Sequence, residues 1–206
     1  MSGLRERQKA DREKRILKAA VTKFRAQGYH AVRIEDLADA AEVSVGTVYN
    51  YYRTKGDILI ATVAMEVEEV LAAGAEIVSA PPAGVHDALC TLIFVYYDHS
   101  LKYLSKQMWR SAMALSIEAS ETPNGMRYAE LDQQLAFQVT ELILALRSRG
   151  DIRDDVDPMA LGQVIFNNLN QMFVEFVKNE KTTLKKLKTD VERQMQPLSE
   201  LITNST

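Results

Sequence analysis

The sequence has a single cysteine, three histidines and few residues that interrupt helices, with 9 glycines and 5 prolines among 206 residues. The lone Cys90 can form neither an internal disulfide nor a multi-cysteine metal site, which agrees with a reducing cytoplasm. His30, His86 and His99 are scattered and match no metal-ligand spacing and no Ser-His-Asp pattern. The sequence therefore argues against an enzyme, and it predicts no cofactor and no bound metal.

Long apolar runs and a signal peptide are also lacking. The apolar stretches at 58–65 and 92–97 are far too short to cross a bilayer, and residues 4–15 are charged throughout. The sequence thus predicts a cytoplasmic protein with no membrane partner. Apolar residues still make up 47% of the chain, which is enough for a large core and argues against global disorder.

What the sequence does contain is helical periodicity. Leu, Ala, Glu, Lys, Arg, Gln and Met dominate, and neither strand-like alternation nor an internal repeat occurs, which predicts an all-α fold. A flexible basic arm is expected over residues 1–8, and Pro197 should kink or restart the last helix. Helices are expected at about 9–27, 34–41, 45–51, 58–78, 85–103, 105–119, 126–148, 158–178 and 182–203.

The most informative stretch, residues 44–55, contains Ser, Thr, Asn and three Tyr and ends in Arg-Thr-Lys. It follows a short helical pattern at 34–41 and a three-residue turn, Glu42-Val43-Ser44. Two short helices joined so tightly predict a helix-turn-helix, whose second helix can enter a DNA major groove. The polar residues of this second helix suit contacts to phosphates and base edges.

The distribution of charge agrees with DNA binding. The whole chain carries a net charge of −3, but residues 1–56 hold 12 Lys and Arg against 7 Asp and Glu. Residues 57–206 hold 13 against 21. A basic segment on an acidic body fits local binding of phosphates, although charge alone also permits a solvated tail. A nonspecific architectural DNA-binding protein would usually be basic throughout.

Each side chain of the second helix has a role that its chemistry suggests. Ser44 should cap the helix and favour a phosphate there, and Gly46 lets the backbone approach DNA closely. Val45 and Thr47 can contact a thymine methyl or a base edge, and Asn50 can pair with adenine or remain solvated.

Phosphate contacts are expected around this helix. Tyr49 and Tyr51 should donate their hydroxyls to phosphate oxygens, although Tyr49 can instead pack against the first helix. Lys55 should hold a phosphate together with the N-terminus of the helix that follows, and Arg33 is a further candidate. The basic residues of the N-terminal segment follow the DNA backbone, enter a minor groove or form a solvated face; they are Arg5, Arg7, Lys9, Arg12 and Arg15.

Residues 15–59 resemble the TetR family of bacterial transcriptional repressors. The resemblance lies at Ile16-Leu17, Ala20, Phe24, Gly28-Tyr29, Asp36-Leu37-Ala38, Ala41, Val43-Ser44, Gly46-Thr47-Val48-Tyr49, Tyr51-Tyr52, Lys55 and Leu59. The rest of the chain matches the family only in helix count, length and order. Two positions depart from the family pattern. Family members usually have Gly where Glu42 stands, which predicts a slightly different turn. They commonly have Thr where Arg33 stands, and Arg cannot cap a helix as Thr does.

The resemblance implies a DNA-binding domain over residues 1–55 and a helical effector-binding and dimerisation domain over residues 56–206. It implies a repressor that binds a palindromic operator in double-stranded DNA as a homodimer, because one recognition helix contacts few base pairs. An unidentified small-molecule effector would release the repressor from DNA. A ligand-dependent activator and a repressor without ligand control, both of the same fold, are the alternatives.

Apolar stripes on the last two helices are candidates for the dimer interface, and part of each stripe must also close the core of the subunit itself. The stripe residues are Leu161, Val164, Ile165, Met172, Phe173, Phe176, Leu184, Leu187, Val191, Met195, Leu198 and Ile202.

Aromatic and amide side chains of the middle helices and the penultimate helix predict a small-molecule pocket, with ordinary core as the alternative for each residue. The amides among residues 167–171 are expected to include some that face inward, to bind a ligand or to form bonds across the dimer. The pocket candidates are Tyr96, Tyr97, His99, Trp109, Met113, Gln134, Phe137, Gln138, Phe166, Asn167, Asn170 and Gln171.

Overall fold

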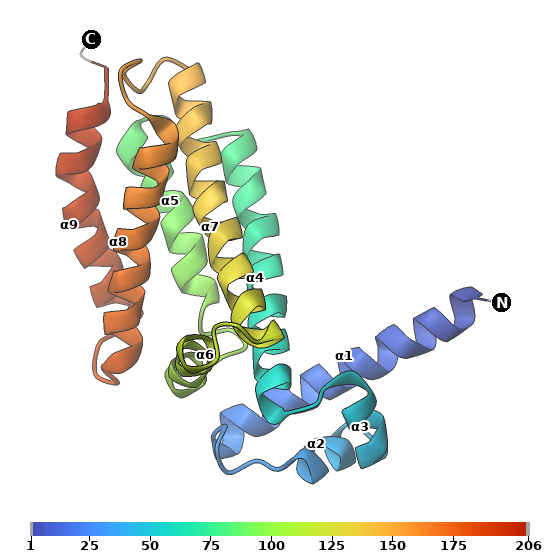
Figure 1. The fold of residues 1–206 in the computed structure, drawn as a ribbon. Coiled ribbons are helices and arrows are strands. Elements are labelled where there is room, and N and C mark those ends of the chain that lie inside the picture. The colour runs from blue at the N-terminus through green and yellow to red at the C-terminus, as the bar shows by residue number, and fades with distance from the viewer. Residues whose placement is uncertain (1, 205–206) are drawn as a thin grey trace. The chain divides into compact units, whose positions relative to one another are not determined.

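The computed structural model describes residues 2–204, and within them it contains nine helices and no strand, which confirms the all-α fold class (Figure 1). The helices are α1 (Ser2–Gln27), α2 (Ile34–Ala40), α3 (Val45–Tyr51), α4 (Lys55–Ser79), α5 (Val85–His99), α6 (Lys106–Glu118), α7 (Pro123–Ser148), α8 (Pro158–Lys178) and α9 (Leu184–Ile202). None of these helices is long and apolar enough to span a membrane.

The chain forms two compact units. The first runs up to residue 65 and also takes in residues 103–128, whereas the second consists of 66–102 and the chain from 129 onward. Helix α4 therefore contributes its first turns to one unit and its remainder to the other. The expected domain over 56–206 divides differently from these units, because α6 groups with the three N-terminal helices.

The first unit is built on a small core that α1 shares with α2 and α3. Phe24, Leu37 and Val48, one from each of these helices, are at most 1% exposed. Helix α1 begins at Ser2, so the structure corrects the expected flexible arm over residues 1–8 for the part that it describes. Residues 4–10 are Leu, Arg, Glu, Gln, Lys and Ala, which all have high helix propensity.

Two helix boundaries also differ from the expectation, and both involve proline. Helix α7 begins at Pro123 rather than near residue 126, because proline is well tolerated at the first helical position. Helix α9 contains Pro197 in its interior and neither restarts nor ends there. Met195, Ser199 and Ile202 are buried on either side of it, and this packing offsets the cost of about 3 kcal/mol that an interior proline carries.

The second unit is a helical bundle in which α9 packs against α5 and α8 (Figure 1). Glycines permit two close approaches of helices to α7. A Cβ atom at Gly162 of α8 would lie 2.9 Å from the Cα atom of Thr140, and one at Gly74 of α4 would lie 2.0 Å from Gln138 Oε1. An isolated bridge between Ile152 and Thr203 joins the loop after α7 to the end of α9.

Candidate functional site

The turn of the helix-turn-helix contains Glu42, which has a φ of 54° and is the only non-glycine residue with positive φ in the described chain. The N–H of Glu42 donates to the carbonyl of Asp39 at 3.1 Å, and that of Val43 donates to the carbonyl of Ala38 at 3.0 Å. The expectation of a different turn is thus corrected. Glu42 adopts the left-handed conformation that favours glycine, at a cost of about 1 kcal/mol.

Ser44 caps α3 as expected. Its Oγ accepts the N–H of Thr47 at 3.0 Å and lies 2.8 Å from Thr47 Oγ1. Gly46 follows in the first turn, and a Cβ atom placed there would meet Ser44 Oγ at 3.9 Å and nothing closer. Packing within the subunit therefore does not require glycine at position 46.

The remaining residues of α3 divide between core and surface. Val48 is 0% exposed and holds the helix to the domain, whereas Tyr49 is 51% exposed. Asn50 is exposed, and Val45 and Thr47 are partly so. The three predicted base-reading residues and Tyr49 therefore all have surface available to a partner, and Tyr49 does not take the buried alternative.

The next two tyrosines face α1. The hydroxyl of Tyr51 donates to the carbonyl of Lys9 at 3.0 Å, so its proton is already used within the protein. The hydroxyl of Tyr52 donates to Glu13 at 3.3 Å, and burial together with the Glu13 carboxylate raises the pKa of this phenol. Both residues thus fix α3 against the N-terminal half of α1, and Tyr51 would have to exchange this bond to reach a phosphate.

Lys55, at the start of α4, lies over the connector between α1 and α2. Its Nζ donates to the carbonyls of Val32 at 2.9 Å and His30 at 3.1 Å and lies 4.7 Å from the centre of the Tyr29 ring. Burial lowers the pKa of this ammonium. Because an ammonium has three N–H donors, one remains for a phosphate.

The predicted phosphate ligand Arg33 is exposed and forms an ion pair with Glu35 at 3.3 Å. Its side chain does not cap α2, which agrees with the expectation for arginine at this position. Asp36 instead accepts the backbone N–H of Arg33 at 2.8 Å, which gives this N-terminal backbone donor of α2 a hydrogen-bond partner.

Asp57 is a residue of this region that the sequence analysis did not single out. Its carboxylate accepts the backbone N–H groups of Arg53 at 2.7 Å and Thr54 at 2.9 Å, and it also accepts the side-chain amide of Asn124. Burial alone would raise the pKa of Asp57, but hydrogen bonds from Asn124, Thr54 and Arg53 hold it below the usual value. The spacing Thr54-x-x-Asp57 resembles a capping box, so the sequence could have indicated that these two residues cap the start of α4. The contact of Asp57 with Asn124 could not be predicted in this way, because the two residues are far apart in the sequence.

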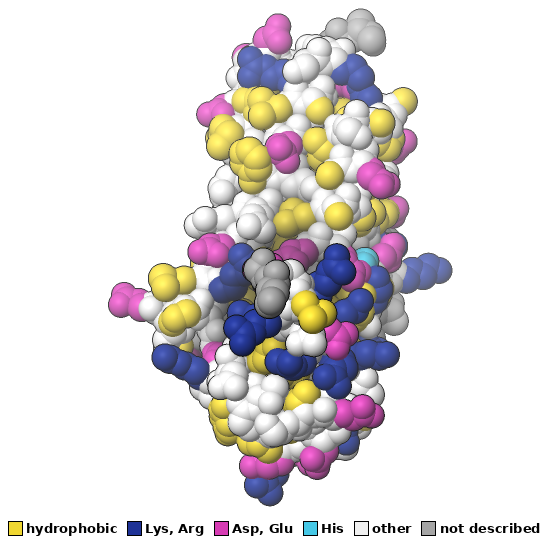
Figure 2. All heavy atoms as spheres, turned by 90° about the vertical axis from the view of Figure 1, so that its right-hand side faces the viewer, with side chains coloured by type: hydrophobic (Ala, Val, Ile, Leu, Met, Phe, Trp, Pro, Cys, Tyr) yellow, Lys and Arg dark blue, Asp and Glu magenta, His cyan; other side chains and the backbone are white. Residues whose placement is uncertain are grey.

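The N-terminal half of α1 is strongly basic. Arg5, Arg7, Lys9 and Arg12 are all exposed, and Lys and Arg side chains gather around this end of the chain in Figure 2. Arg15 differs from them, because its guanidinium donates to the carbonyl of Ala41 at 3.1 Å and so ties α1 to the end of α2.

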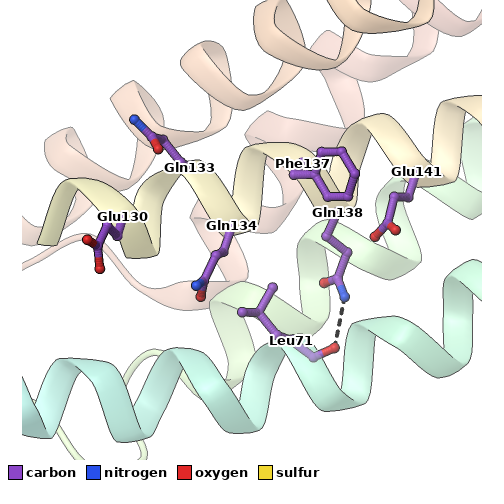
Figure 3. A pocket seen from close by; sticks show the side chains of 7 residues that line it. All are labelled: Leu71, Glu130, Gln133, Gln134, Phe137, Gln138 and Glu141. Carbon is purple, nitrogen blue, oxygen red and sulfur yellow. Dashed lines mark hydrogen bonds between the residues drawn. The ribbon is translucent and has the colours of Figure 1, made fainter. Parts of the chain in front are cut away.

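A cavity of about 530 Å³ lies between α4 and α7 in the second unit, and Figure 3 shows its lining. Gln138 points from α7 toward α4, where its Nε2 donates to the carbonyl of Leu71 at 2.8 Å. Its Oε1 accepts the hydroxyl of Tyr96 at 2.8 Å. The predicted pocket residues Gln134, Phe137 and Gln138 meet here, together with Glu130, Gln133 and Glu141.

A second cavity, of about 250 Å³, lies between α7 and α8 and brings together the predicted Phe137 and Phe166. Phe137 is 55% exposed and lines both cavities, whereas Phe166 is 6% exposed. Asp132 and Met159 also line this cavity, and burial raises the pKa of Asp132 to about 6. The sequence analysis did not single out Asp132, because a single carboxylate in a polar stretch of helix gives no distinctive pattern.

Other predicted pocket residues lie elsewhere. Tyr97 donates its hydroxyl to the carbonyl of Leu169 at 2.8 Å, and His99 Nδ1 lies 2.7 Å from Glu66 Oε1. Trp109 and Met113 belong to the first compact unit. No group of three or more His, Cys, Asp or Glu side chains that could hold a metal ion occurs in residues 2–204.

The amides of α8 lie at the surface or are partly buried. Asn167 and Gln171 are exposed, and Asn167 accepts a hydrogen bond from Gln163 at 2.8 Å. Asn168 donates to Gln194 of α9 at 2.9 Å, and Asn170 is only partly buried. The side chains of Asn167, Asn168 and Gln171 all form hydrogen bonds with other polar side chains near the surface.

Most of the predicted dimer stripe lies inside the subunit. Ile165, Phe176, Leu187, Val191 and Met195 are at most 4% exposed, so they stabilise the subunit's own core. Leu161, Met172 and Leu184 keep partial exposure. The large apolar residues that these two helices leave exposed are Val164 of the predicted stripe, together with Met159 and Leu201.

The comparisons with known proteins agree with this geometry. The family model for bacterial regulatory proteins of the tetR family matches residues 16–62, which span α2 and α3. The HTH-type transcriptional repressor KstR of Rhodococcus jostii (strain RHA1) is 38% identical over 60 residues, which make up 29% of this chain and 28% of KstR.

Two comparisons extend over most of the chain. The fatty acid metabolism regulator protein of Bacillus subtilis (strain 168) is 25% identical over 180 residues, covering 84% of this chain and 88% of that protein. The crystal structure of the transcriptional regulator FadR from Bacillus subtilis in complex with stearoyl-CoA has the same fold. Its TM-score is 0.66 at 21% identity, and the match covers 88% of this chain and 96% of that one. Residues 16–62 are therefore similar to bacterial regulatory proteins of the tetR family, and the chain over most of its length is similar to a transcriptional regulator that has the same fold.

Proposed function

We propose that this regulator is a repressor that binds a palindromic operator as a homodimer and that a small molecule in the second compact unit releases it from DNA. The observation that carries the proposal is the exposed face of α3. Gly46 has no packing reason within the subunit, and Tyr49 and Asn50 are exposed beside it. KstR, which is named a repressor, is similar to the chain over 60 residues.

The proposed contacts to DNA are of two kinds, contacts to base edges and contacts to phosphates. Val45, Thr47 and Asn50 read base edges, and Tyr49 donates to a phosphate. The third N–H of Lys55 and the exposed guanidinium of Arg33 add further phosphate contacts. Ser44 and Tyr51 act mainly by holding α3 in place, because their hydrogen bonds within the domain are already formed.

The dimer would form through the outer face of α8, with α9 beside it. Val164, Asn167 and Gln171 recur at spacings of three and four and are all exposed, so they share one face of the helix. Val164 is 59% exposed and Leu201 of α9 is 70% exposed. A twofold axis at this face would bury these apolar side chains and let the amides bond across it.

Release by an effector would follow from a shift in population. A ligand that binds best to the conformation with mis-spaced recognition helices lowers DNA affinity by its differential affinity for that state. Two cavities of the second unit offer sites, and the FadR structure contains stearoyl-CoA in a protein of the same fold. Helix α4 contributes to both compact units, and it is the natural connection between ligand and α3.

Selection of binding sites from a random DNA library tests the DNA and dimer parts of the proposal. The expected result is a palindrome whose half-site centres lie about one DNA turn apart or a multiple of it. Sedimentation of the complex should show an even number of chains. Equal affinity for all sequences, or a monomer on a single half-site, would contradict the proposal. A reporter fused to the regulated promoter should rise in activity when the protein is removed, whereas an activator would give the opposite change.

A further inference from the structure

The exposed ridge of α7 is flanked by a cavity on each side, and both cavities are acidic. Gln133 and Phe137 line both of them. Glu130 and Glu141 line the cavity toward α4, and Asp132 lines the one toward α8. Lys, Arg and His are absent from both linings. The two linings therefore contain carboxylates and no cationic side chain.

Asp132 is the carboxylate that lines the cavity between α7 and α8. It is partly buried, and burial is the sole cause that raises its pKa to about 6, with no hydrogen bond and no opposite charge to counter it. Removing a carboxylate from water without a partner costs free energy. A positively charged group placed beside Asp132 would recover this cost.

The rest of the cavity is apolar and aromatic. Phe137, Met159 and Phe166 line it, and Thr140 and Gln163 supply the remaining polar groups. Aromatic ring faces attract organic cations, most strongly where water is partly excluded. A volume of about 250 Å³ admits an ammonium group with a short apolar chain.

We propose that the cavity between α7 and α8 binds a small organic cation, with its ammonium group against Asp132 and its apolar part against Phe137, Met159 and Phe166. This proposal names a ligand class for the effector. The regulatory role of the cation rests on the proposed function, whereas the binding of the cation is independent of that function. An anionic ligand would instead meet the Asp132 carboxylate in this cavity, whose lining contains no Lys, Arg or His.

Calorimetric titration of the full chain with hexyltrimethylammonium tests the proposal, and hexanesulfonate serves as an anionic probe of similar size. The cation should bind and the anion should not. Asp132→Asn should weaken the binding of the cation at least tenfold. The matched control Asp154→Asn, at an exposed site in the loop before α8, should leave it unchanged. Circular dichroism of both variants checks that the fold is kept.

Proton release gives a second measurement that a merely structural role for Asp132 would not change. The cation favours the ionised carboxylate, so binding near pH 6 should release protons, and the affinity should rise between pH 5 and pH 7. Asp132→Asn should abolish both effects. Equal binding of the cation by Asp132→Asn, or tighter binding of the anion, would overturn the proposal.

Titration of the selected operator DNA separates this inference from the proposed function. Release of DNA by hexyltrimethylammonium, lost in Asp132→Asn, supports both. If stearoyl-CoA releases the DNA while the cation does not bind, the proposed function stands and the cation site is wrong. If Asp132→Asn changes the oligomeric state of the protein in solution and the cation does not bind, the cavity belongs to the subunit interface and the proposal fails. Binding of the cation through Asp132 without any effect on DNA upholds the site and removes its regulatory role.

Discussion

The ammonium nitrogen of Lys55 lies 2.9 Å from the carbonyl oxygen of Val32, so the first residue of α4 holds the connector that leads into α2. A second bond, to the carbonyl of His30 at 3.1 Å, strengthens this attachment. The sequence indicated a phosphate ligand at this position. The structure adds that the same ammonium fixes the domain that carries α3, so the two roles must be separated by experiment.

Lys55→Met keeps the apolar stem and removes the charge. We expect a loss of about 1–2 kcal/mol in the free energy of unfolding, because two carbonyls lose a charged donor. Affinity should fall for all DNA sequences alike, and the salt dependence should weaken by about one phosphate contact. Denaturation in urea and DNA titration at several salt concentrations measure these effects. Lys185→Met, at an exposed site on α9, is the control for stability. An unchanged salt slope would limit Lys55 to the structural role.

Gly46→Ala separates the stability of α3 from its binding to DNA. Alanine has a higher helix propensity than glycine, and a Cβ atom at this position meets nothing closer than 3.9 Å. Stability in urea should therefore stay equal or rise by up to about 1 kcal/mol. Affinity for the operator should nevertheless fall at least tenfold, because the added methyl group would clash with DNA that approaches the backbone of α3 closely. Gly3→Ala, a helical glycine of α1 with nothing near its Cβ position, should leave DNA binding intact. A Gly46→Ala variant with full affinity would rule out the close approach.

The pH dependence of stability provides a prediction about Asp132. Burial raises its pKa to about 6 in the folded protein, above the ordinary value of 3.8. The folded state therefore binds more protons than the unfolded state between these values, and stability falls as the pH rises through this window. Asp132→Asn should be more stable than the natural chain at pH 8, by about 1–2 kcal/mol, and this advantage should vanish near pH 4. Urea denaturation at pH 4, 6 and 8 measures the difference. A constant difference at all three pH values would contradict the assignment to this carboxyl.

Local signals predicted the bounds of two helices. The N-cap residue Ser44 and the N1 proline at position 158 allowed α3 and α8 to be predicted with the bounds that the structure has. The extension of α1 to Ser2 could not be predicted in this way, because its first turns have helix propensity but no apolar stripe.

Apolar periodicity identifies a buried face but not what covers it. Ile165 and Val191 were expected at a dimer interface, and both are 0% exposed within one subunit. The same limit applies to the cavities, because spacing places Gln134 and Phe137 on α7 but does not reveal that Leu71 lies opposite. Such contacts join residues far apart in the chain, and only packing of the whole bundle determines them.

Val164→Arg tests which surface of the second unit meets a second copy. Val164 is 59% exposed on the outer face of α8, so arginine costs the isolated subunit little. At a twofold interface the same residue approaches from both subunits, and two arginines would repel each other. The variant should sediment as a monomer with an unchanged circular dichroism spectrum and should lose specific DNA binding. Leu144→Arg, at a site 44% exposed on α7, should remain a dimer and bind DNA normally. A dimeric Val164→Arg would place the interface elsewhere, and a monomeric Leu144→Arg would place it on α7.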